Sequence, residues 1–308
     1  HIRIGTFEFA AMQNIKTLKK LADYSISRHY PDLKDVDDKY LKFFASVCNR
    51  QAKLVSKWMN IGFVHGVMNT DNITISGETI DYGPCAFMDS YDPEIVFSSI
   101  DIGGRYSYKN QPAILIWNLS KLAQTLIPLI DKKENKAIEK LTEVLQHVMP
   151  CYQEYFYKEL GKKLGLESLN KKHIILIKDY LKILKSESID FTLSFRNLSN
   201  ILGKIMTIED SVFVNVNDFK KWLKNWNDEI SKKINIKDVI KKMDLINPCY
   251  IPRNHIIENA LHNALNGDMS LIEELMQLYK NPFEEQEKKD LFKKPAETRS
   301  QYVTFCGT

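Results

Sequence analysis

Apolar residues recur every three to four positions between residues 37 and 60, which predicts a long amphipathic helix. The pattern stops at Ile61-Gly62, where a glycine can end a helix. We therefore expect one long helix that leads directly into the loop that follows. Its apolar positions are Tyr40, Leu41, Phe44, Val47, Cys48, Leu54, Val55 and Trp58.

The helical pattern returns over most of the remaining chain. Pro112 suits the first turn of a helix, and we assign Trp117 within that helix to the core. The chain shows no internal repeat, and the expected fold class is α+β and mostly helical. Further helices are expected at about 135–161, 171–185, 217–233 and 252–265, joined by short polar segments.

A β-hairpin is expected at residues 73–80. Ile73-Thr74-Ile75 and Thr79-Ile80 alternate apolar and polar residues around a Ser76-Gly77-Glu78 turn. Such a hairpin holds the residues at its outer ends, Asn72 and Asp81, close to each other.

The stretch GFVHGVMNTDNITISGETIDYG around this hairpin has the spacing of a protein-kinase catalytic loop. In that template His-x-Asp is followed by an Asn five residues after the Asp and then by Asp-Phe-Gly. His65 takes the position of the His, Asn72 that of the Asn, and Asp81-Tyr82-Gly83 that of Asp-Phe-Gly. Val67 stands where the catalytic Asp belongs, and its aliphatic side chain cannot accept a proton. A carboxylate, Asp71, lies directly beside Asn72.

These side chains allow two interpretations. Mg²⁺ and Mn²⁺ bind carboxylate and amide oxygens together with phosphate oxygens of a substrate, so Asn72 and Asp81 predict a metal–nucleotide site. Alternatively, Asp71 and Asn72 cap a turn and Asp81 ends an edge strand, which is a common role of such residues in loops. We favour the metal–nucleotide site because three spacings agree with one template. His65 is expected to support the loop instead of transferring protons.

Six blocks of sequence, in the same order, resemble the SelO (selenoprotein O) family, also called YdiU. The resemblance covers essentially all 308 residues, as the C-terminal part of such a protein. It implies a kinase-like fold that binds ATP in a flipped orientation. The blocks are HIRIGTFE at 1–8, HGVMNTDN at 65–72, IDYGP at 80–84, GRYSYKNQP at 104–112 with WNLSKLAQ at 117–124, NPCYIPRNH at 247–255 and TFCGT at 304–308.

The resemblance also implies an activity and a set of site residues. SelO proteins transfer AMP from ATP to Ser, Thr or Tyr hydroxyls of proteins and release pyrophosphate, and UMP transfer with Mn²⁺ is attributed to bacterial members. By motif position, Asp71 is similar to the catalytic base of the family. Asn72 and Asp81 are similar to its Mg²⁺ ligands, and Arg3 to the arginine that contacts the nucleotide phosphates. ATP and protein substrates are the implied partners.

The resemblance implies two parts of the chain. Residues 1–131 correspond to a kinase-like large lobe with the catalytic loop and metal site, and residues 132–308 to a helical extension with a C-terminal cysteine tail. The 308 residues contain no glycine-rich phosphate loop and no Val-Ala-x-Lys strand. We therefore expect a C-terminal fragment that lacks the small lobe. The alternative function is a catalytically inactive kinase-like remnant that acts as a binding module.

The amino-acid composition limits the classes of binding partner and the cellular compartments that we expect. A net charge of +4, from 43 basic and 39 acidic residues, is too balanced to indicate nucleic acid. Five cysteines without a Cys-x-x-Cys pair argue against a zinc site or a secreted disulfide scaffold. We see no apolar run of about 18 residues, so a membrane span is not expected. The expected location is cytoplasmic for a bacterial chain and mitochondrial for a eukaryotic one.

Two further features lie outside the catalytic loop. In SelO relatives the position of Cys306 is cysteine or selenocysteine, and in some it pairs with a cysteine of the activation segment. Here Cys85 is the local candidate, and Phe97 occupies the partner position of better-known bacterial relatives. Either Cys306 forms a regulatory disulfide or it is a free thiol.

Asp101 and Arg105 are expected to hold the activation segment through one salt bridge, or else to shape the site.

Overall fold

The computed structural model describes residues 1–214, 216–233, 235–296 and 302–304, and this part of the chain is mostly helical with one two-stranded sheet. The predicted α+β, mostly helical class is confirmed, and the kinase-like lobe stays a prediction. The strands are β1 (Phe63–Val64) and β2 (Ala86–Phe87). The helices are α1 (Ile4–Gln13), α2 (Ile15–His29), α3 (Lys39–Asn60), α4 (Gln111–Ile130), α5 (Glu134–Gln146), α6 (Val148–Lys163), α7 (Lys171–Ser186), α8 (Phe191–Leu202), α9 (Asn217–Ile230), α10 (Ile236–Asp244), α11 (Asn254–Leu265) and α12 (Ser270–Leu278).

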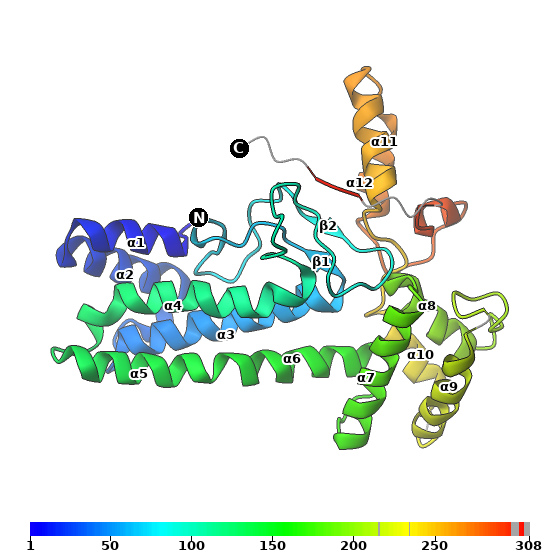
Figure 1. The fold of residues 1–308 in the computed structure, drawn as a ribbon, viewed down its shortest axis with the longest axis horizontal. Coiled ribbons are helices and arrows are strands. Elements are labelled where there is room, and N and C mark those ends of the chain that lie inside the picture. The colour runs from blue at the N-terminus through cyan, green and yellow to red at the C-terminus, as the bar shows by residue number, and fades with distance from the viewer. Residues whose placement is uncertain (215, 234, 297–301, 305–308) are drawn as a thin grey trace.

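Helices α3, α4, α5 and α6 form the framework of the molecule and lie alongside one another along its long axis (Figure 1). The predicted helix at 37–60 is α3, and it buries one apolar stripe that includes Phe43, Val47 and Val55. It ends as predicted, because Gly62 adopts a positive φ of 72°. Helices α5 and α6 follow residue 131 in sequence but pack against α3 and α4. The boundary at residue 131 stays a prediction.

The single helix expected at 135–161 is two helices. Helix α5 ends at Gln146, His147 lies between them, and α6 begins at Val148. Pro150 lies in the first turn of α6, where the missing N–H of a proline costs no intrahelical hydrogen bond, whereas inside a continuous helix it would. The proline therefore separates α5 from α6.

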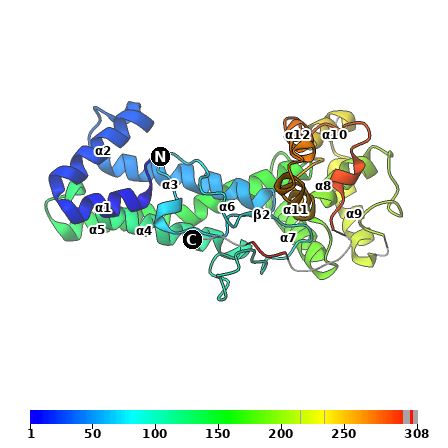
Figure 2. The same ribbon diagram turned by 90° about the horizontal axis from the view of Figure 1, so that it is seen from above.

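The C-terminal half forms a second group of helices at one end of the molecule (Figure 2). Helix α7 packs against α9, and α8 packs against α10. Helices α11 and α12 pair with each other around a separate small core that includes Cys249, Tyr250 and Leu275. Helices α1 and α2 lie at the opposite end (Figure 2).

Helix α4, one of the framework helices, is long and rich in apolar residues. This helix and the turn before it, residues 108–130, are long and apolar enough to cross a membrane by length and composition alone. The expectation that no apolar run reaches this length was therefore wrong. Core helices pass the same test, and α4 packs against α1, α3 and α5 through buried residues such as Leu115, Leu119 and Leu122.

Candidate active site

Strands β1 and β2 carry the loop in which the sequence places the site. They pair antiparallel, with Phe63 opposite Phe87 and Val64 opposite Ala86. We call residues 63–87, from the start of β1 to the end of β2, the site ribbon. Its two strands lead into and out of the loop, so their pairing fixes both ends of the loop relative to each other (Figure 1).

The predicted hairpin within the site ribbon is confirmed. Ile73 and Thr79 form an antiparallel bridge, and Gly77 turns the chain with φ of 81°. Thr74 Oγ1 donates to Glu78 O at 2.8 Å and accepts from the Glu78 N–H at 3.1 Å. The chain therefore reverses direction between Ile73 and Thr79, with Asn72 directly before the bridge and Asp81 two residues after it.

The hairpin is fastened to the helices by side chains that bind its backbone carbonyls. Gln51 of α3 donates to Thr74 O at 2.5 Å, and the Tyr30 hydroxyl donates to Ile75 O at 2.5 Å. The hairpin is short, and these contacts supply the support that a longer sheet would provide.

Arg3 reaches the same place from the start of the chain. Its backbone forms an antiparallel bridge with Thr74, flanked by Ile4 N–H to Ile73 O at 2.9 Å and Ile75 N–H to Ile2 O at 3.0 Å. The Arg3 side chain is exposed at the start of α1. The first residues of the chain therefore form a third strand-like segment beside the hairpin.

Asp71 lies on a short 3₁₀ turn, Thr70–Asn72, and its backbone N–H donates to Oδ1 of the capping residue Asn69 at 3.1 Å. Its carboxylate is exposed and covers Gly5 in the first turn of α1, since a Cβ on Gly5 would lie 2.1 Å from Asp71 Oδ1. A helix N-terminus favours negative charge, and glycine permits this close approach. The structure thus places Asp71 beside the turn of α1 that follows Arg3.

Asn72 and Asp81 carry oxygen atoms at the two outer ends of the hairpin. Asn72 is buried, and its amide nitrogen donates to Val67 O at 3.0 Å, which leaves the amide oxygen to bind a ligand. Asp81 is exposed and holds a left-handed backbone with φ of 56°. Aspartate tolerates that conformation, and such strain is concentrated at functional sites.

This donor set fits a magnesium ion bound together with a nucleotide. One carboxylate and one amide oxygen are typical protein ligands of Mg²⁺ in phosphate-transfer sites, where waters and phosphates complete the shell. Among the residues that the structure describes, no three His, Cys, Asp or Glu side chains gather to hold a metal by themselves. A site of this kind therefore depends on the nucleotide for its remaining ligands.

His65 supports the loop, as expected. It is buried, its Nε2 lies 2.9 Å from Ile80 O, and its Nδ1 accepts the Val67 N–H at 3.4 Å. Burial lowers the pKa of His65, so the ring is neutral and its Nε2–H donates to Ile80 O. The side chain ties the start of the loop to the residue before Asp81.

Two amide side chains of α4 also hold the loop, and the sequence analysis missed them. Gln111 accepts the His65 N–H at 2.9 Å and donates to Phe63 O at 3.0 Å. Asn118 donates to Met68 O at 2.8 Å. The signal was present, because two amides spaced seven residues apart share one face of a largely apolar helix.

The segment after Asp81 differs in detail from the expectation. Asp101 accepts the backbone N–H groups of Arg105 and Tyr106 at 2.8 and 2.7 Å, and the salt bridge between Asp101 and Arg105 is absent from this described segment. The Arg105 guanidinium instead lies 4.7 Å from the centre of the Trp117 ring. Trp117 is 37% exposed, so its assignment to the core was wrong.

Cys306 lies outside the described residues, and its pairing stays a prediction. Nearby, Thr304 pairs in parallel with Ser98, and its hydroxyl donates to Pro84 O at 3.0 Å. Burial raises the pKa of the Cys85 thiol to about 11. The Cys85 thiol is therefore protonated near neutral pH, and its reactivity is correspondingly low.

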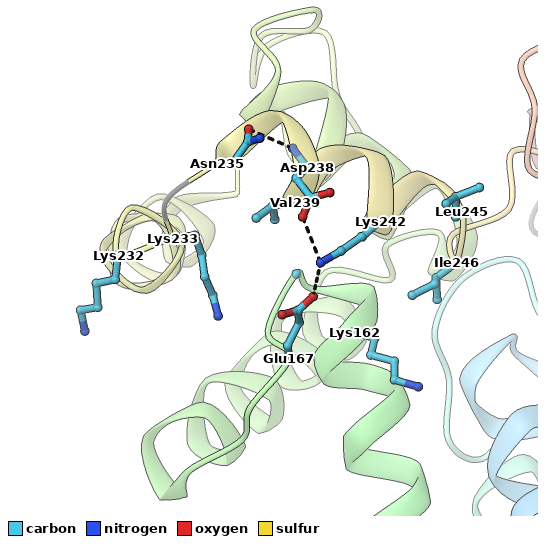
Figure 3. A pocket seen from close by; sticks show the side chains of 11 residues that line it. Lys162, Glu167, Lys232, Lys233, Asn235, Asp238, Val239, Lys242, Leu245 and Ile246 are labelled. Atoms are coloured by element: carbon cyan, nitrogen blue, oxygen red, sulfur yellow. Dashed lines mark hydrogen bonds and ion pairs between the residues drawn. The ribbon is translucent and has the colours of Figure 1, made fainter.

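A cavity of about 770 Å³ lies elsewhere, among α6, α9 and α10 (Figure 3). Lys242 crosses it and pairs with Glu167 at 2.7 Å and with Asp238 at 2.9 Å. None of the predicted site residues lines this cavity. Lys242, Glu167 and Asp238 pair with one another, and we do not assign the transfer chemistry to this cavity.

Known proteins match the chain over its whole length. A family model described as "Protein adenylyltransferase SelO" matches residues 1–280. A "Protein nucleotidyltransferase YdiU" from Maridesulfovibrio salexigens is 45% identical over 313 residues, which cover 100% of this chain and 63% of that relative. Relatives of the same name from Cereibacter sphaeroides and Clostridium perfringens are 44% and 41% identical over 311 residues each. The chain thus spans 62–63% of the length of these curated relatives.

Proposed function

Because the chain belongs to the SelO family, we propose that it carries the transfer site of a protein nucleotidyltransferase. The reaction moves AMP from ATP to a Ser, Thr or Tyr hydroxyl of a protein and releases pyrophosphate. UMP transfer from UTP is a variant of the same chemistry. The relatives are bacterial, and a cytoplasmic location, where ATP is available, is part of this proposal.

One observation carries the proposal: Asp71 and Arg3 flank the first turn of α1, and Asn72 follows Asp71 directly in the loop. Sequence positions 3 and 71 are far apart, and the pairing of Arg3 with Thr74 brings them to one surface. A base, a phosphate-binding cation and two metal ligands are the groups that phosphoryl-type transfer requires.

Each residue has a separate role in the proposed reaction. Asp71 accepts the proton of the attacking hydroxyl, whose oxygen forms a bond to the α-phosphorus while the bond from that phosphorus to the pyrophosphate oxygen breaks. Arg3 offers its planar guanidinium to the phosphate oxygens. Asn72 and Asp81 would hold Mg²⁺ or Mn²⁺, which neutralises charge on the phosphates when bound. His65 keeps Asp81 and the loop in register.

A kinase reaction and a binding module are both less consistent with the findings. Val67 cannot act as a base, and its backbone N–H is bound to His65 Nδ1. The curated relatives carry the name of a nucleotidyltransferase, which favours an enzyme over an inactive remnant.

The position of the label in ATP tests the proposal. A polypeptide of the relatives' length that contains these 308 residues is incubated with ATP labelled at either the α- or the γ-phosphate. We expect the α-label in protein and the γ-label in pyrophosphate. Incorporation of the γ-label into protein would contradict nucleotidyl transfer and favour a kinase reaction.

Asp71→Ala tests the base. We expect transfer of the α-label to fall by about 10²–10⁴-fold, the usual contribution of a general base, while nucleotide binding persists. Val67→Asp in the same background restores no transfer, because the flipped nucleotide presents a different phosphorus. Glu78→Gln, an exposed carboxylate at the hairpin turn, is the matched control and keeps full activity. Unchanged transfer by Asp71→Ala contradicts its assigned role.

A further inference from the structure

The block NPCYIPRNH at 247–255 is part of the family resemblance but has no role in the proposed chemistry. Its Arg253 side chain is fully buried. One guanidinium nitrogen, Nη1, lies 2.6 Å from both Asp89 Oδ1 and Asp190 Oδ2. The other, Nη2, donates to Lys293 O at 2.6 Å and to Asp190 Oδ1 at 3.3 Å. One arginine thus joins three segments that are distant in sequence.

Asp89 and Asp190 lie on two segments that already pair through their backbones. Tyr91 N–H donates to Ile189 O at 2.8 Å, and Phe191 N–H donates to Asp89 O at 2.7 Å. Asp190 also caps α8, since it accepts the Leu193 N–H at 2.7 Å. This pairing brings two carboxylates together, and the guanidinium compensates their charge. Removal of one partner leaves a buried charge uncompensated, which is strongly unfavourable.

These contacts continue into the site ribbon. The neighbouring Asn254 donates to Phe87 O, in β2, at 3.3 Å. Met88 N–H donates to Gly62 O at 2.9 Å, just before β1. Residues 253 and 254 therefore bind the chain at and directly after the end of β2, the strand that follows the Asp81 turn. A shift of β2 would move Asp81 relative to Asn72.

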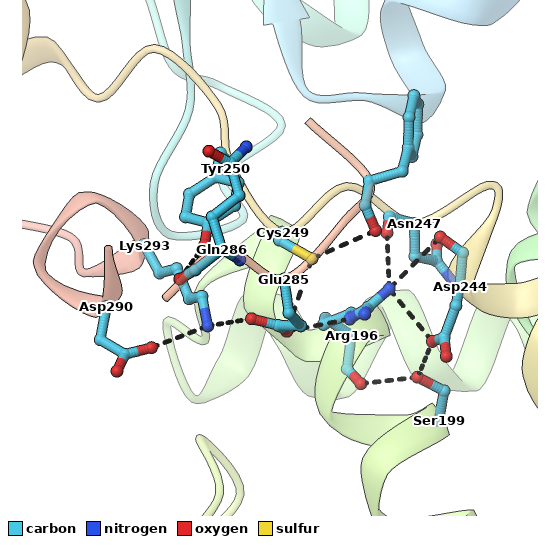
Figure 4. Close-up of polar contacts among 11 residues, drawn as sticks. Arg196, Ser199, Asp244, Asn247, Cys249, Tyr250, Glu285, Gln286, Asp290 and Lys293 are labelled. Carbon is cyan, nitrogen blue, oxygen red and sulfur yellow. Dashed lines mark hydrogen bonds and ion pairs between the residues drawn. The ribbon is translucent and has the colours of Figure 1, made fainter. Parts of the chain in front are cut away.

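A second buried arginine in the same region provides a contrast. Arg196 of α8 pairs with Asp244 Oδ1 at 3.1 Å and donates to Asn247 O at 3.4 Å, while Ser199 donates to Asp244 at 2.6 Å (Figure 4). These contacts join α8 to the end of α10. They include no residue of the site ribbon.

We propose that Arg253 is a positioning residue for the transfer site: it clamps Asp89 and Asp190 so that β2 and the Asp81 turn stay in register with the catalytic loop. The proposal rests on the proposed function for its effect on transfer. The geometric part of the proposal, that Arg253 holds β2 in position, does not depend on that function.

Hydrogen exchange tests the geometric part. The variants Arg253→Lys and Arg196→Lys each keep the positive charge and lose the planar fork. In Arg253→Lys we expect the amides of Met88 and Tyr91 to exchange about tenfold or more faster, because their hydrogen bonds open more often. In Arg196→Lys we expect them to exchange as in the parent. Equal protection of these amides in Arg253→Lys and the parent overturns the proposal.

Kinetics test the functional part in a polypeptide of the relatives' length. Both variants are expected to melt at a lower temperature, but only Arg253→Lys lowers kcat, by about tenfold or more. A loss of kcat that follows melting temperature equally in both variants reduces Arg253 to a structural residue. If the parent itself transfers no nucleotide, the proposed function fails, and the exchange comparison still decides whether Arg253 positions β2.

Asp89→Asn covers the case in which Arg253→Lys does not fold. It keeps the Arg253–Asp190 pair and the cap of α8, and Asp89 is partly exposed. We expect faster exchange at Met88 and Tyr91 in a folded protein. Unchanged exchange in folded Asp89→Asn overturns the proposal.

Discussion

The site ribbon and the framework helices α3–α6 are stabilised in different ways. The framework buries apolar side chains such as Val47, Leu119 and Leu122 between neighbouring helices. The site ribbon has strands of two residues each and depends on side chains from elsewhere, including Gln51, Gln111 and Asn118, that bind its backbone.

Because of this difference, the framework mainly determines the stability of the protein and the polar contacts of the site ribbon mainly determine the positions of the site residues. Burial is non-directional and scales with area, so the framework tolerates small shifts. Hydrogen bonds depend on distance and angle, so each polar contact of the site ribbon fixes one position. We therefore expect framework substitutions to change the free energy of unfolding and ribbon substitutions to change function first.

Asp81→Asn is expected to give the largest functional effect. Asparagine keeps the left-handed backbone at residue 81 but removes the charge of the proposed metal ligand, so Mg²⁺-dependent ATP binding should be lost while the melting temperature stays close to that of the parent. Calorimetric titration with ATP and Mg²⁺, in a polypeptide of the relatives' length, measures this. Unchanged affinity contradicts the metal assignment, and Glu78→Gln serves as the control.

Leu122→Ala in α4 is expected to show the opposite behaviour. Leu122 is fully buried, and truncation of such a leucine costs about 2–5 kcal/mol of unfolding free energy. Urea denaturation of the 308-residue chain measures the loss. Lys121→Ala, next to it on the helix, should change the unfolding free energy by less than about 0.5 kcal/mol. Equal losses would contradict the assignment of Leu122 to the core.

Asn118→Leu tests a contact between the two regions. The substitution keeps the size of the side chain but leaves Met68 O without its donor at 2.8 Å, at an expected cost of about 1–3 kcal/mol. Hydrogen exchange should increase in the loop around Met68 and remain slow in α3. Thr125→Val on the same helix is the control, because its hydroxyl bonds only within α4. Uniform loss of protection across both regions would contradict the separation.

The charge of the buried Lys163 makes the stability of the protein depend on pH. Lys163 is buried beneath Phe191 and Phe195 and donates to Asn60 O at 2.5 Å, and burial lowers its pKa to about 7. Between that pKa and the ordinary value near 10.5, the unfolded chain binds more protons than the folded one. Stability from this group therefore rises with pH across the window, and its charge is most costly below pH 7.

Lys163→Met removes this dependence. Its stability relative to the parent should be highest at pH 7 and fall by up to about 1.4 kcal/mol for each pH unit toward pH 9. Urea denaturation at pH 7, 8 and 9 measures the difference. Lys162→Met, at the adjacent surface position, should follow the parent at all three values. Parallel curves for Lys163→Met and the parent would show that Lys163 keeps an ordinary pKa.

The sequence predicted α3 and the hairpin because each has a simple period and a glycine at its end. Helix α1 was missed because it carries apolar residues on both faces, with Phe9 and Met12 exposed. Helix α8 was also missed, although its apolar residues lie on one side as in α3; polar residues such as Ser194 and Asn197 are buried along it. Periodicity detects helices with one apolar face, and α1 lacks that pattern.

The site shows the same limit. Spacing along the loop was sufficient to propose Asn72 and Asp81 as metal ligands, whereas the role of Asp71 as a base came from the family resemblance. The position of Arg3 beside them depends on a backbone pairing with Thr74 that no local pattern encodes. The clamp formed by Arg253 joins residues 164 positions apart, and such contacts become visible only in the folded chain.

The parallel pairing of Thr304 with Ser98 has a consequence for biosynthesis. Residue 98 leaves the ribosome about two hundred residues before residue 304, and synthesis proceeds at roughly 5–20 residues per second. For some ten seconds or more, the segment after Asp81 therefore exists without the strand that completes it. The nascent chain cannot assemble the finished surface around Pro84 until translation of this region is over.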